Sequence, residues 1–160
     1  MRLAKTLVLL VLIGSASCAS RKGPVTTDPA IFKPVAVRLH PVFTEIKDWT
    51  GDGQSDGVEA FVELTDQFDD PVKAGGQVLF ELYTFRRQFP DARGNRIASW
   101  VMPLRTLKQQ REHWRKIGGA YAFQLALTNM PDYSSAVLTA EFTLDDGGRL
   151  RDEIIVGARR

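Results

Sequence analysis

Alternation of apolar and polar side chains constrains the fold of this chain more than any other feature of its sequence. Successive side chains of a β-strand point to opposite faces, so a period of two buries one face and leaves the other in water. At residues 58–65 the apolar set Val58, Ala60, Val62 and Leu64 alternates with a more polar set. Alternation of this kind, together with one short apolar run at residues 78–85, predicts seven strands in all, over residues 35–46, 58–65, 78–85, 97–102, 120–127, 137–144 and 150–156.

Seven strands with turn signals between most of them indicate an all-β fold, built as a single antiparallel sandwich. Residues 78–85 are apolar on nearly both faces, so we expect them to form a central strand. Asp145–Gly148 tolerates the positive φ of a tight turn, which predicts a C-terminal hairpin. One short helix is expected over Leu107–Lys116, where it would close one end of the sandwich.

The segment Val62–Phe80 resembles the strand, tight turn and return of bacterial immunoglobulin-like and transthyretin-like modules. Those modules usually show a strand, Asp, a turn with Gly or Asp, Pro-Val and then Val-x-Phe. Here the matching residues are Asp66, the pair Pro71–Val72 and the stretch Val78–Phe80. The resemblance implies an immunoglobulin-like sandwich, a fold that mostly serves adhesive, spacer or recognition roles and does not by itself define an activity.

The N-terminus has the three parts of an export signal. Arg2 and Lys5 supply positive charge, residues 7–13 form an apolar run too short to span a bilayer, and small residues follow. We therefore predict a signal peptide over residues 1–17. Residues 18–32 contain two prolines and no apolar periodicity, which predicts a flexible tether, and residues 33–160 form the sandwich domain.

Cys18 is the only cysteine of the chain, and it stands directly after the small residues of the signal. In this position it resembles the lipobox of bacterial lipoproteins. The resemblance implies cleavage before Cys18, a thioether-linked diacylglycerol on its sulfur and acylation of the new N-terminus. Two or more acyl chains anchor a protein stably on a membrane. Ala19, rather than Asp, implies the outer membrane by comparison with Gram-negative lipoproteins.

One residue of this region departs from the lipobox. Ser15 stands where the family usually has Leu or another aliphatic residue, and Ser15–Ser17 would also suit ordinary signal peptidase cleavage. The alternative product is a soluble secreted protein with a free thiol. An odd free thiol is a liability in an oxidising compartment, which favours lipidation of Cys18.

The charge balance excludes some classes of partner. The chain has 21 Lys and Arg against 19 Asp and Glu, and loss of Arg2 and Lys5 with the signal leaves 19 against 19. A nucleic-acid-binding protein needs surplus cations to displace phosphate counterions, so no nucleic-acid partner is expected. One Cys and two His also exclude a closed Cys/His zinc site.

The loop Asp48–Glu59 has the oxygen spacing of an EF-hand calcium loop, with Gly53 at the sharp bend. Its flanks look like strands, which excludes a paired-helix sensor but leaves a calcium-braced loop between two strands. The alternative is an Asp/Gly-rich turn whose carboxylates cap backbone N–H groups. The tentative calcium ligands are Asp48, Thr50, Asp52, Gln54, Asp56 and Glu59.

Other candidate residues have a structural and a functional interpretation. For His40 and His113 we expect surface or packing roles, because neither has an evident nucleophile partner. A basic cluster surrounds one acid near the predicted helix and is interpreted as a solvated helix face, with an anion-binding patch as the alternative. Its members are Arg105, Lys108, Arg111, Arg115 and Lys116.

These features together predict a lipid-anchored structural or binding module of the bacterial envelope, without catalytic activity and with a protein or glycan partner that the sequence does not identify. One alternative is a glycan-binding module that uses exposed Trp49, Trp100 and Trp114 and a calcium-braced loop. Another is a hydrolase, which would require acids such as Asp52 and Glu59 to converge in a cleft.

Overall fold

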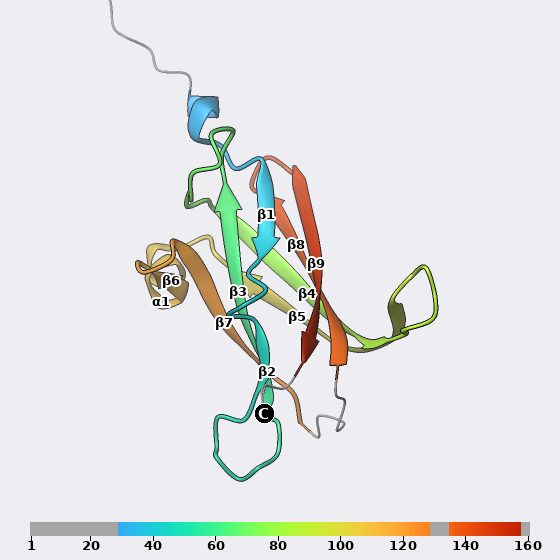
Figure 1. The fold of residues 1–160 in the computed structure, drawn as a ribbon. Coiled ribbons are helices and arrows are strands. Elements are labelled where there is room, and N and C mark those ends of the chain that lie inside the picture. The colour runs from blue at the N-terminus through green and yellow to red at the C-terminus, as the bar shows by residue number, and fades with distance from the viewer. Residues whose placement is uncertain (1–28, 129–134, 158–160) are drawn as a thin grey trace, which may run out of the picture.

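A computed structural model describes residues 29–128 and 135–157 of the chain. The predicted signal peptide, Cys18 and most of the predicted tether lie outside these residues. The described chain is an all-β sandwich in which two antiparallel sheets face each other (Figure 1). Neither of the two helical segments in these ranges has the length and hydropathy of a membrane-crossing helix.

The strand order is that of an immunoglobulin-like sandwich. The first sheet runs β1 (Ala36–Leu39), β3 (Gly57–Thr65), β7 (Ala120–Ala126) and β6 (Trp114–Arg115), and β2 (Glu45–Lys47) also pairs with β3. The second sheet runs β5 (Arg93–Pro103), β4 (Gly76–Phe85), β8 (Ser135–Leu144) and β9 (Arg149–Gly157). A 3-10 turn, η1 (Pro29–Phe32), precedes β1, and one α-helix, α1 (Leu107–His113), precedes β6.

The core lies between the two sheets and is built from the apolar positions of the period-two pattern. Phe80 of β4 and Phe123 of β7 meet across the sheets, with ring centroids 5.2 Å apart. At the open side of the sandwich, the Asp152 carboxylate of β9 accepts the backbone N–H of Leu39 in β1 at 2.7 Å. The largest fully buried side chains are Tyr121, Phe80, Phe123, Phe142, Leu64, Leu82, Leu104, Leu125, Leu138, Val58, Val62 and Val78.

Most predicted strands are confirmed, and the central position of residues 78–85 is confirmed because β4 lies between β5 and β8. The strand predicted over residues 35–46 is instead divided into β1 and β2 by a turn. Pro41 in this turn has no N–H to give to a sheet. Thr44 replaces part of the lost pairing, since its Oγ1 accepts the backbone N–H of Phe61 at 3.0 Å.

The predicted helix Leu107–Lys116 is too long at its C-terminal end. It starts at a capping box, in which the Thr106 hydroxyl accepts the N–H of Gln109 and the Gln109 side chain accepts the N–H of Thr106. After His113 the backbone becomes extended, and Trp114 pairs with Tyr121 as part of β6. The Trp114 ring packs edge-on against Tyr121 at 5.0 Å, and this tertiary contact ends the helix early.

The segment Val62–Phe80 does contain a tight turn, but its two strands belong to different sheets. The Asp66 carboxylate accepts the N–H groups of Phe68 and Asp70 at 2.9 and 3.2 Å, which stabilises the turn. Val72 still donates its N–H to Leu64 at 2.8 Å before the chain crosses to the second sheet. Pairing of the residues after the turn with the first sheet is therefore limited to a short bridge at Pro71.

Candidate functional site

The loop between β2 and β3 is organised by two carboxylates that bind its own backbone. Asp56 accepts the N–H groups of Trp49 and Thr50 at 2.6 and 2.9 Å. Asp48 accepts those of Gly51 and Gly53 at 2.6 and 2.8 Å, and these bonds lower the pKa of the Asp48 carboxyl below its usual value. Both glycines have positive φ, 76° and 87°, which the tight loop requires.

The carboxylate and hydroxyl groups among the other predicted calcium ligands are also engaged within the chain. Asp52 accepts the N–H of Gln54 at 2.8 Å, and the Thr50 hydroxyl lies 3.2 Å from Asp48 Oδ1. Glu59 lies on β3 and forms an ion pair with Lys47. Within residues 29–128 and 135–157 no group of three or more His, Cys, Asp or Glu side chains is placed to hold a metal ion. The hydrogen bonds match the backbone-capping interpretation, and calcium binding stays a prediction.

Asp56→Ala is expected to lower the free energy of unfolding by about 1–2 kcal/mol, because two loop N–H groups lose their acceptor. Chemical denaturation measures this loss. The same loss is expected in calcium and in chelator, since the carboxylate acts here on the backbone. A thermal midpoint of the unmodified protein that rises with calcium would contradict this interpretation and support the metal-braced loop.

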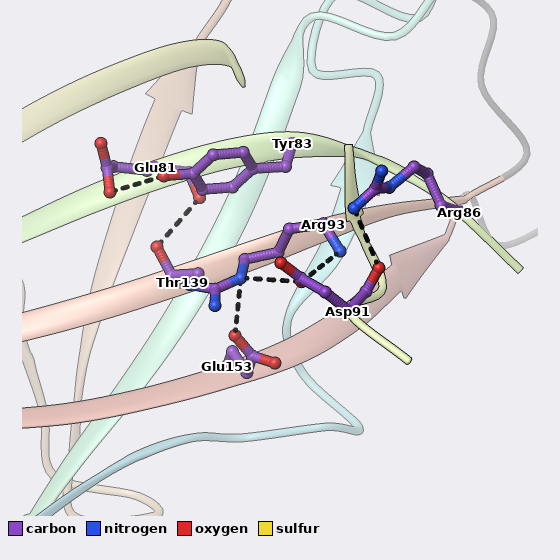
Figure 2. A network of polar contacts seen from close by, with 7 residues as sticks. All are labelled: Glu81, Tyr83, Arg86, Asp91, Arg93, Thr139 and Glu153. Carbon is purple, nitrogen blue, oxygen red and sulfur yellow. Dashed lines mark hydrogen bonds and ion pairs between the residues drawn. The ribbon is translucent and has the colours of Figure 1, made fainter. Parts of the chain in front are cut away.

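A second polar group lies on the outer face of the second sheet, where side chains of β4, β5, β8 and β9 line a groove of about 380 Å³. Glu81 accepts hydrogen bonds from Arg96 at 2.6 Å and from the Tyr83 hydroxyl at 2.8 Å. Arg93 lies between Asp91 and Glu153, at 3.3 and 3.6 Å (Figure 2). Each charge in this network faces an opposite charge on the same surface.

The charged side chains that line the groove are paired with one another, and these pairs stabilise the sheet. The Arg96 hydrogen bond, followed by that of Tyr83, lowers the pKa of the Glu81 carboxyl. Glu141 is held in the same way between Arg149 and Arg151, at 3.3 and 2.5 Å. Cross-strand pairs of opposite charge stabilise a sheet, although each partly exposed pair contributes only a little.

The Glu81 pair makes a prediction about acid stability. Because its pKa is lowered in the folded state, the contribution of the pair is complete above the unfolded value of about 4.3 and is lost as the pH falls through the folded value. Glu81→Gln is expected to remove this pH-dependent contribution, which amounts to at most about 1 kcal/mol of the free energy of unfolding. Thermal midpoints between about pH 7 and pH 3 measure it. Glu63→Gln, on the outer face of β3, is the matched control, and an equal effect in both variants would contradict the assignment.

The three tryptophans do not form one platform. Trp100 donates its indole N–H to the carbonyl of Ala126, the last residue of β7, at 2.9 Å. Trp114 packs beside Tyr121, near the first residue of β7. Trp49 belongs to the β2–β3 loop, and all three side chains are partly buried. The three rings therefore do not form a glycan-stacking surface together.

The two histidines have packing contacts, as expected. The ring of His113 lies 4.5 Å from that of Phe123, and its Nδ1 is 3.1 Å from the carbonyl oxygen of Ala122. The ring of His40 stacks on Phe43 at 4.4 Å.

The largest group of exposed cations without an ion pair among the described residues lies where α1 meets β6, and we call it the basic corner. Its cations are exposed and comprise Lys73, Lys108, Arg111, Arg115 and Lys116. Two exposed aliphatic residues lie among them, Leu107 at 75% and Ile117 at 96% of their full accessibility. Trp114 and Lys116 line two adjoining and largely apolar hollows of about 480 and 580 Å³.

The cations of the basic corner are not neutralised by nearby acids. Among the described residues, none of the five has a carboxylate oxygen within ion-pair distance, whereas Arg38, Arg93, Arg96, Arg105, Arg149 and Arg151 all do. Lys73 lies 4.5 Å from the centre of the Trp114 ring, and Arg115 donates to the carbonyl of Glu112 at 2.8 Å. Glu112 is the one acidic residue between Leu107 and Gly119.

The sequence revealed part of this corner but not its composition. The basic cluster was visible as a run of cations near the helix, although Arg105 pairs with Asp145 and so leaves the unpaired set. Lys73 comes from the segment between β3 and β4 and joins the corner only through the fold. The exposure of Ile117 follows from its place in the turn between β6 and β7, directly after the end of the predicted helix.

In comparisons with known proteins, neither a protein-family model nor a curated protein sequence matches the chain.

Proposed function

We propose that this chain is a lipid-anchored, non-enzymatic module of the bacterial cell envelope that binds an anionic partner through the basic corner. One observation carries the binding function: five exposed cations surround exposed aliphatic side chains and lack carboxylate partners among the described residues. Two adjoining and largely apolar hollows lie in the same corner, and an apolar surface rimmed by charged residues is typical of a binding site. Charge of one sign attracts and orients a partner of the opposite sign.

The anchor is supported by the sequence. Positive charge, an apolar run and small residues precede Cys18, and the resemblance to a lipobox implies a diacylglycerol on its sulfur. Ala19 favours the outer membrane, and the sandwich then stands on its periplasmic face. Ordinary signal peptidase cleavage, which gives a secreted soluble form, is the alternative.

Catalysis is left out of the proposal because the acids considered for hydrolysis serve separate structural contacts. Asp52 accepts a backbone N–H in the β2–β3 loop, and Glu59 pairs with Lys47 on the face of the first sheet. Glycan binding remains the second candidate, through Trp114 of the basic corner rather than through three tryptophans. Retention on insoluble polysaccharide that is lost in Trp114→Ala would favour it.

The intact mass of the protein purified from the membranes of exporting cells tests the anchor. We expect a chain that starts at Cys18 and carries the added mass of a diacylglycerol and an acyl group. A mass that includes Met1, or a free thiol at Cys18, would overturn the proposal. The basic corner has its own test, which does not depend on the lipid.

A further inference from the structure

We propose that the basic corner docks on the surface of an anionic phospholipid membrane, with Ile117 and Leu107 entering the interfacial region and the surrounding cations binding lipid phosphates. The proposal deepens the function above and rests on its membrane anchor for its biological setting.

The tip of the β6–β7 hairpin has the shape needed to enter an interface. The last pair of the hairpin joins Arg115 to Ala120, and four residues form the turn. Gly118 and Gly119 have φ values of 91° and 61°, so the turn bends sharply and leaves Ile117 96% exposed. An isoleucine at a projecting turn loses its contact with water when the turn enters the interfacial region of a membrane.

The charges around this tip match an anionic lipid surface. Arg115 and Lys116 directly precede Ile117, and Lys108 and Arg111 lie on α1 beside β6 (Figure 1). Each Lys or Arg near an anionic leaflet adds to the attraction, which salt weakens. Trp114 lies among these cations, and tryptophan is favoured at the boundary between lipid and water.

The point where the chain enters the sandwich lies at the same end of the first sheet as this tip, so the anchor and the corner can reach one membrane together. Val35 donates its N–H to the carbonyl of Thr65 at 2.8 Å, and Thr65 is bridged to Pro71. Gly119 lies against Pro71, since a Cβ built at Gly119 would be 2.8 Å from the Pro71 Cβ. The tip and the N-terminal entry therefore lie at the same end of the first sheet, at its two opposite edges.

Chain length keeps the corner near the lipid to which Cys18 is proposed to be joined. The stretch from Cys18 to Pro29 can extend over at most about 40 Å. Such a short connection holds the domain at a high effective concentration against the leaflet, so a weak contact is enough to dock it. The lipid surface is therefore favoured over a diffusing acidic protein as the occupant of the corner.

Vesicle co-sedimentation tests the docking without the anchor. The probe protein is residues 18–160 with Cys18→Ser, which is the proposed mature chain without lipid. We expect it to bind vesicles of equal parts phosphatidylglycerol and phosphatidylcholine at least about tenfold more tightly than pure phosphatidylcholine, and less tightly as salt rises. Equal binding to both vesicles, or to neither, would overturn the proposal.

Variants separate the basic corner from the net charge of the protein. Arg115→Glu with Lys116→Glu is expected to weaken binding to anionic vesicles about tenfold or more, and Ile117→Ser about threefold or more. The matched control is Arg86→Glu with Arg87→Glu, which makes the same charge change in the β4–β5 turn and should leave binding nearly unchanged. Equal loss in both double variants would overturn the docking site. An unmodified Cys18 in the native protein would overturn the anchor alone, because the probe protein carries no lipid.

Discussion

Replacement of Cys18 by serine is expected to transfer nearly all of the protein from the membrane fraction to the soluble fraction of exporting cells. The resemblance to a lipobox implies that the sulfur of Cys18 carries a diacylglycerol, and a serine hydroxyl would leave the protein without that thioether. Each buried methylene of an acyl chain contributes about 0.8 kcal/mol, so the loss of two or more chains removes far more than any surface contact can replace.

The salt concentration matters in this measurement, because the basic corner is itself proposed to bind membranes. Protein held only by electrostatic contacts is released at high salt, whereas lipidated protein stays with the membrane. Membranes are therefore washed in high salt before immunoblotting of both fractions. Ser17→Ala, which keeps a small residue before the cysteine, is the control and is expected to stay in the membrane. If the chain without any substitution is itself found in the soluble fraction after the wash, the secreted alternative is correct.

Phe80→Ala is expected to lower the free energy of unfolding by about 3–5 kcal/mol, a large part of the stability of an ordinary domain. Phe80 has no exposed surface, and its ring contacts Phe123 of the opposite sheet at 5.2 Å. Truncation removes the apolar surface and leaves a cavity that neither sheet can close without bending. Urea denaturation followed by circular dichroism measures the loss.

Phe68→Ala is the matched control, because it makes the same chemical change at a side chain that is 63% exposed. We expect it to alter the free energy of unfolding by no more than about 0.5 kcal/mol. Similar losses in the two variants would mean that Phe80 does not lie between the sheets, and the packing described here would then be wrong.

The elements that the sequence predicted best are those governed by local geometry. Residues 58–65 and 137–144 alternate, and both form long strands in which Val58, Ala60, Val62, Leu64, Leu138, Ala140 and Phe142 are buried. The turn at Asp145–Gly148 joins β8 to β9, and Gly147 has the positive φ, 88°, for which the turn residues were selected. Such features depend only on residues that are adjacent in the chain, so they can be predicted without knowledge of the fold.

The candidate site was less predictable because its parts come from distant segments. Oxygen spacing in the loop Asp48–Glu59 suggested calcium, but spacing does not reveal that Asp48 and Asp56 bind the loop backbone instead. Likewise, the cations near α1 were visible in the sequence, while the unpaired state of Arg111 and the contribution of Lys73 depend on the fold.

The sequence by itself determined where strands form, which of their faces is apolar and where the C-terminal hairpin turns, because strand period and turn conformation are properties of a few adjacent residues. Only the tertiary structure decided that β3 and β4 belong to different sheets, that α1 ends at His113 and that Ile117 stands exposed among cations. These outcomes depend on which apolar faces bury each other and which charges find partners, and residues far apart in the chain settle both.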